Sequence, residues 1–99
     1  MINHVVLFKL KEYPAQEKQK VVSELKAMLL ALKEKIAELK YIEVGENYEL
    51  DAKSYDMALI THFESLEDLD KYRVHPEHQK VVKYVGEVTE ARAAVDFRF

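Results

Sequence analysis

The chain has 99 residues and a formal charge of −3; 48% of its residues are hydrophobic, 33% are charged, and none is Cys. This length holds one hydrophobic core, so we predict a single domain over residues 1–99, and the composition excludes disordered and repetitive classes. The lack of Cys excludes disulfides and a cysteine nucleophile, and the mild mixed charge argues against nucleic acid as a partner.

The beginning of the chain carries none of the marks of an exported protein, because no basic start, long apolar segment or cleavage site is present. No run of about 18 apolar residues marks a membrane span. We therefore expect a cytoplasmic protein that has no membrane partner.

The first predicted strand covers residues 2–10, which are mostly β-branched and aromatic. Alternation places His4, Val6 and Phe8 on one face of this strand and Val5 and Leu7 on the other. Both faces are thus apolar at their centre, unlike a sheet with one solvated face.

A long amphipathic helix is predicted after Pro14, a residue well tolerated in the first turn of a helix. Apolar residues recur at three- and four-residue steps from Val21 to Leu39, and Lys and Glu occupy the intervening positions. The helix is expected to end between Lys33 and Lys40, although no Gly or Pro marks the boundary.

Two strands follow, at residues 41–49 and 55–63, and residues 50–54 form a polar connection between them. Alternation in the second of these strands gives one face with Met57, Leu59 and Thr61. The opposite face is predicted to carry Asp56, Ala58, Ile60 and His62.

The last part of the chain is predicted to hold two short helices and a strand. Ser65 and Asp68 have the spacing of a capping box, so a helix begins at Leu66. Pro76 starts a second helix, which Gly86 is expected to close. The stripe of this helix that faces the sheet comprises His78, Val81, Val82 and Val85, and residues 91–99 form the last strand.

The resulting order, β-α-β-β-α-β with the second helix broken in two, predicts an α+β ferredoxin-like fold. It has a four-stranded antiparallel sheet with helices on one face. Apolar residues remain on the uncovered face, so we expect two copies to pair through it as a homodimer. These residues are Val5, Leu7, Ile60, Val95 and Phe97.

Three segments together resemble the stress-responsive dimeric α/β-barrel (A/B barrel) family: residues 4–9 (HVVLFK), 72–78 (YRVHPEH) and 95–97 (VDF). The resemblance implies ferredoxin-like protomers whose sheets pair into a barrel. Many bacterial members have no established activity, whereas a few plant members are cofactor-independent polyketide cyclases that use a Tyr–His pair. That pair matches Tyr72 and His78, and the strand histidine of the family matches His4.

His78 is our candidate general base, because an imidazole has a pKa of about 6.5 and can therefore exchange a proton at neutral pH. Tyr72 is the candidate hydrogen-bond donor to a developing oxyanion. His4 is expected to be buried and hydrogen-bonded to a backbone carbonyl, or else to orient a ligand or to pair with His78. The residues predicted to line a small apolar cavity and bind a small organic molecule are His4, Val6, Phe8, Leu25, Leu59 and Val82.

No cofactor and no metal are expected, because His75 and His78 lie on opposite sides of the proline break and no further ligand cluster appears. Two alternatives remain open. One is a non-catalytic stress-responsive dimeric module in which Tyr72, His75 and His78 pack and cap helices. The other is a cofactor-independent monooxygenase-like enzyme, which rests on fold analogy alone.

Overall fold

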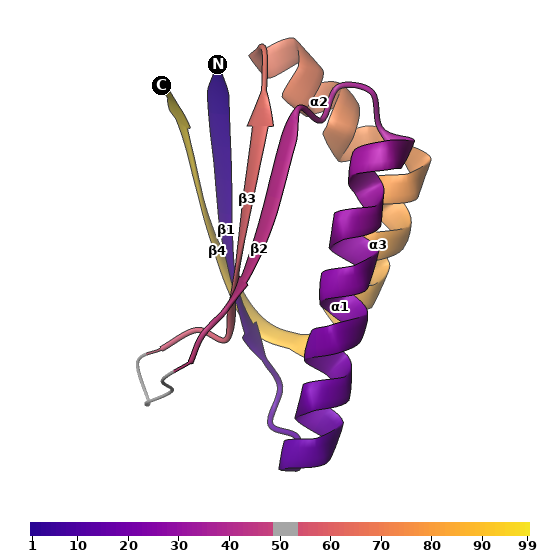
Figure 1. The fold of residues 1–99 in the computed structure, drawn as a ribbon, viewed down its shortest axis with the longest axis vertical. Helices are drawn as coiled ribbons and strands as arrows, with labels where there is room; N and C mark the ends of the chain where they lie inside the picture. Colours follow the sequence, from indigo (N-terminus) through magenta and orange to yellow (C-terminus); the bar gives the residue numbers. More distant parts are fainter. Residues whose placement is uncertain (49–53) are drawn as a thin grey trace.

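The computed structural model describes residues 1–48 and 54–99, and it confirms the predicted ferredoxin-like fold. Four strands form one antiparallel sheet in the order β2-β3-β1-β4. All three helices lie on one face of this sheet (Figure 1). The elements are β1 (Ile2–Leu10), α1 (Ala15–Lys35), β2 (Tyr41–Glu46), β3 (Met57–Phe63), α2 (Leu66–Val74), α3 (Pro76–Val88) and β4 (Thr89–Arg98).

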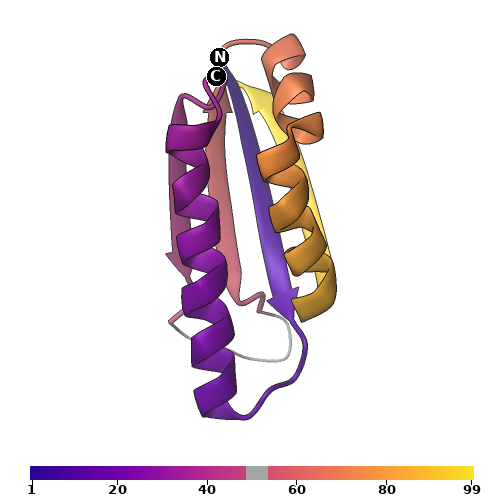
Figure 2. The same cartoon turned by 90° about the vertical axis from the view of Figure 1, so that its right-hand side faces the viewer.

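The helices divide the covered face between them. Figure 2 shows α1 in front of β2 and β3, while α3 lies in front of β4. Leu25, Leu29 and Leu32 of α1 are buried against the sheet. Burial alternates along β1 and β3 as predicted, with His4, Val6 and Phe8 on the helix side. None of the described helices is both long and apolar enough to cross a membrane.

The two short helices begin as the sequence predicts. The Ser65 hydroxyl accepts a hydrogen bond from the Asp68 N–H at 3.1 Å, which caps α2. His75, the residue before Pro76, has an extended backbone and ends α2. Its Nδ1 accepts the Glu77 N–H at 3.1 Å, so this side chain also caps α3.

Some boundaries differ from the prediction. The helix α3 continues past Gly86 to Val88, and Thr89 ends it, its hydroxyl donating to the Val85 carbonyl at 2.7 Å. The prediction that Gly86 closes this helix is therefore wrong, and β4 begins at Thr89. The strands β2 and β3 are shorter than predicted, and the connection predicted at 50–54 lies mostly outside the described residues.

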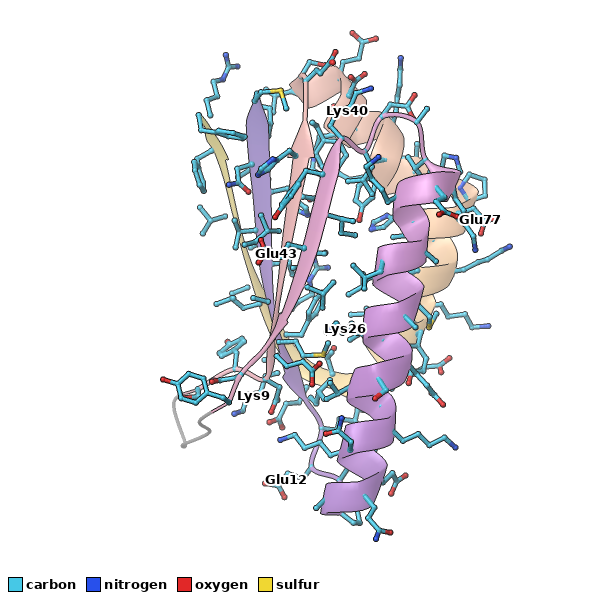
Figure 3. All side chains as sticks on the ribbon, in the orientation of Figure 1. Lys9, Glu12, Lys26, Lys40, Glu43 and Glu77 are labelled. Atoms are coloured by element: carbon cyan, nitrogen blue, oxygen red, sulfur yellow. The ribbon has the colours of Figure 1, made fainter. Side chains whose placement is uncertain are left out.

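None of the described helices covers the second face of the sheet. Leu7, Val95 and Phe97 are 39%, 61% and 46% exposed there. Val95 lies opposite Val5 in the β1–β4 register, so these apolar side chains form one continuous patch. Figure 3 shows side chains standing out from this face, among them Glu43, with no other element packed against them.

Asp56 lies just before β3 and is buried, contrary to its predicted place on the open face. One carboxylate oxygen accepts the Leu10 N–H at 2.7 Å, and the other lies 2.7 Å from Lys18 Nζ. The Asp56 N–H donates to the Phe8 carbonyl at 2.9 Å. Asp56 thus ties the end of β1 and the first turns of α1 to β3.

Candidate functional site

A cavity of about 430 Å³ lies between the sheet and the α2–α3 pair. This volume is within the range of small-molecule sites, which combine an apolar lining with a few convergent polar groups. Val6, Phe8 and Leu59 of the sheet and Val81 and Val85 of α3 supply much of the apolar lining. The main polar groups are His4, Tyr72, Arg73, His78, Arg92 and Asp96.

The structure places five of the six residues predicted to bind a ligand at this cavity, namely His4, Val6, Phe8, Leu59 and Val82. The sixth, Leu25, does not line it, because its side chain is fully enclosed in the core between α1 and the sheet. Leu29, one helical turn further along α1, reaches the cavity instead. The binding role of these residues stays a prediction.

Tyr72 and His78 meet at the cavity although they belong to different helices. Their ring centroids are 4.2 Å apart, and the planes are tilted by 35°. The extended backbone of His75 changes the chain direction between α2 and α3, which lets both rings line one space. Phe63 packs on Tyr72 with a centroid distance of 4.9 Å and helps to fix the ring.

The Tyr72 hydroxyl is buried and has no hydrogen-bond partner among the described residues. Burial raises the pKa of Tyr72 to about 12, so the phenol keeps its proton at neutral pH. A buried hydroxyl without a partner is unfavourable in the folded state. The hydroxyl is therefore a hydrogen-bond donor that has no acceptor among the described residues.

His78 is held as a neutral base. Its Nδ1 lies 3.1 Å from the Arg73 carbonyl oxygen, which can only accept, so Nδ1 carries the proton. The second nitrogen, Nε2, is then the basic one. Burial lowers the pKa of His78, the Arg73 carbonyl opposes this effect, and the nearby His4, Arg92 and His75 lower the pKa further.

His4 has a partner that the sequence analysis did not predict. Its Nδ1 contacts the Asp96 carboxylate, rather than a backbone carbonyl or His78. The Arg73 guanidinium donates to the other Asp96 oxygen at 3.1 Å and to Asp70 at 3.0 Å. Arg73 therefore makes two contacts at the site. Its carbonyl oxygen contacts His78, and its guanidinium binds the Asp96 carboxylate that contacts His4.

Arg73, Arg92 and Asp96 also line the cavity, although the sequence did not predict them as site residues. In the β1–β4 register Asp96 lies opposite His4, and Arg92 lies opposite Phe8. Alternation alone puts residues 92 and 96 on one strand face. For Arg92 and Asp96, the sequence did not reveal which strand pairs with β1 or in which register.

Tyr72→Phe is expected to stabilise the protein by about 1 kcal/mol, because it removes a buried hydroxyl that lacks a partner. Urea denaturation of both proteins measures the difference. Tyr84→Phe is the matched control: its hydroxyl donates to Glu24 at 2.9 Å, so its removal is expected to give no gain. A destabilised Tyr72→Phe variant would show that the Tyr72 hydroxyl is satisfied in the folded protein.

Comparison with known proteins identifies the family of the chain. The sequence-family model of the stress responsive A/B barrel domain matches residues 2–99. An uncharacterised Streptomyces coelicolor protein is 32% identical over 79 residues, 80% of each chain. A dimeric protein of unknown function with a ferredoxin-like fold, from Bacteroides fragilis, is 38% identical with a TM-score of 0.89, over 99% of this chain and 95% of that one.

The hydroxynitrile lyase of Passiflora edulis is also similar in structure. Its TM-score is 0.83 over 97% of this chain and 90% of the lyase, at 18% sequence identity, a likeness that shows the fold alone. The family match covers nearly all of the sequence, and the 38% identical structure shares the fold described above. The chain therefore belongs to the stress responsive A/B barrel domain family.

Proposed function

We propose that the chain is a cytoplasmic homodimer whose cavity binds a small organic molecule and catalyses cofactor-free proton transfer on it. His78 is the general base, and Tyr72 is the hydrogen-bond donor to the oxyanion. The observation that carries this proposal is that Tyr72, whose buried hydroxyl has no partner among the described residues, packs its ring on His78 and lines the cavity with it.

The chemistry suited to this pair is proton abstraction from a carbon next to a carbonyl group. Nε2 of His78 takes the proton, and the C–H electron pair moves into the carbonyl to form an enolate. The Tyr72 hydroxyl donates a hydrogen bond to the enolate oxygen. Such a bond stabilises the developing charge more in a site that excludes water than it does in solution. His78 then returns the proton to the substrate, so no cofactor is consumed.

The homodimer is supported by the open face of the sheet. Leu7, Val95 and Phe97 are exposed together on that face, and a contiguous apolar patch is typical of a protein–protein interface. A two-fold interface would bury the same patch on both protomers. The relative from Bacteroides fragilis, 38% identical to this chain, is described as dimeric.

Hydrogen–deuterium exchange on phenylacetone, a neutral ketone with an acidic methylene group, tests the proton transfer. The wild-type protein in D2O is expected to accelerate exchange, followed by proton NMR, beyond imidazole at equal concentration. His78→Gln is expected to reduce the rate by about 10²- to 10⁴-fold. Because burial lowers the pKa of His78, the wild-type rate is expected to reach its plateau by pH 7 and to fall only at pH values below the ordinary imidazole pKa of about 6.5.

His62→Gln is the control for this experiment. His62 lies on the other face of the sheet, stacked on Tyr41 at 4.6 Å, so its replacement is expected to leave the exchange rate unchanged. Wild-type exchange no faster than that of imidazole would contradict the proposal. Full activity in His78→Gln would contradict the role of this residue. Full activity together with altered stability in both His78→Gln and Tyr72→Phe would favour the non-catalytic module.

A further inference from the structure

The net charge of the cavity lining is opposite in sign to the net charge of the whole chain. The chain has a formal charge of −3, whereas the lining contains two guanidinium groups, Arg73 and Arg92, and one carboxylate, Asp96. Asp96 is already satisfied, because one oxygen contacts His4 and the other accepts from Arg73. Arg73 is satisfied as well, since it also pairs with Asp70 at 3.0 Å.

Arg92 is the cation of the lining that has no counter-ion among the described residues. No Asp or Glu in the described ranges lies within ion-pair distance of its guanidinium. Asp96 shares its strand face but is four residues further on, about 13 Å along β4. Arg92 is thus an exposed residue of β4 that lines a largely apolar space, and its guanidinium has no ion-pair partner among the described residues.

Small residues leave room beside Arg92. Ala94, the next residue on this face of β4, offers only a methyl group to the cavity. Gly86 lines the cavity from α3, and a Cβ atom at that position would meet nothing within 4 Å. A ligand group can therefore approach the guanidinium while its apolar part contacts Phe8 and Val85.

We propose that the ligand of this cavity is an organic acid, whose carboxylate binds Arg92 and whose apolar body extends toward Tyr72 and His78. A planar guanidinium binds a carboxylate through two parallel hydrogen bonds, which fixes orientation as well as affinity. This inference rests on the proposed function, because it names the substrate class of the same site. Arg92 acts here as a residue that determines specificity and takes no part in proton transfer.

Two probes that differ in one group test the inference. Phenylpyruvate has a carboxylate where phenylacetone has a methyl group, and both carry the same methylene next to a ketone. Titration calorimetry in low-salt buffer is expected to show wild-type protein binding phenylpyruvate at least tenfold more tightly. Arg92→Gln is expected to weaken phenylpyruvate binding at least tenfold and so to remove this preference.

Arg98→Gln is the matched control, because it removes the same charge from the same strand outside the cavity. This variant is expected to keep the preference for phenylpyruvate. Equal affinities of the wild-type protein for the two probes would overturn the inference and leave the proposed function standing. An unchanged preference in Arg92→Gln, or its loss in Arg98→Gln, would overturn the inference in the same way. Failure of both probes to bind would overturn the proposed function itself.

Discussion

Val95→Asp is expected to turn the proposed dimer into monomers at micromolar concentration. Val95 is 61% exposed in a single chain and lies opposite Val5, within the apolar patch on the open face. Two-fold symmetry would bury two new carboxylates in one interface, and each unpaired buried charge costs several kcal/mol. A loss of about 4 kcal/mol corresponds to roughly a thousandfold increase in the Kd of the dimer.

Sedimentation velocity measures this change, and circular dichroism shows whether the monomer keeps its fold. Val74→Asp is the control, because Val74 ends α2 in the helix layer and is 73% exposed. It adds the same charge away from the sheet and is expected to remain dimeric. A monomeric wild-type protein, or a dimeric Val95→Asp variant, would contradict the proposed interface.

Asp56→Ala is expected to lower the free energy of unfolding by about 2–4 kcal/mol. The substitution leaves the Leu10 N–H without its acceptor and Lys18 without its counter-ion. The side chain of Lys18 is 31% exposed, so water compensates part of its loss, and the buried amide accounts for most of the effect.

Urea denaturation measures this difference, with two variants for comparison. Asp56→Asn keeps an acceptor oxygen for Leu10 and is expected to lose less stability than Asp56→Ala. Asp70→Ala breaks an exposed ion pair with Arg73 and is expected to cost about 1 kcal/mol or less. An Asp56→Ala variant as stable as the wild-type protein would show that the hydrogen bonds of Asp56 do not stabilise the fold.

The fold was predictable because local patterns agree with each other. Alternation in β1 and β3, the periodicity of α1 and the break at Pro76 each need only a few neighbouring residues. The same rule misplaced Asp56, because this residue precedes β3 and does not follow the alternation of the strand. The prediction for Gly86 was wrong for a different reason, since a glycine inside a helix does not by itself end the helix.

The candidate site was predictable only in part. Tyr72 and His78 are six residues apart, so their approach follows from the proline break between them. The contact between His4 and Asp96 joins residues 92 positions apart and depends on the β1–β4 register. Leu25 and Leu29 share one helix stripe, and only the position of α1 on the sheet decides which one reaches the cavity.

The two contacts of Arg73 make the geometry of the site sensitive to local unfolding of α2. Its carbonyl orients one imidazole and its guanidinium, through Asp96, orients the other, so both histidines depend on the last turn of α2. If that turn unwinds, both rings lose their fixed orientation in the same event. The orientation of both histidines thus depends on one helix end, and fraying of that end is expected to release both rings together before the sheet unfolds.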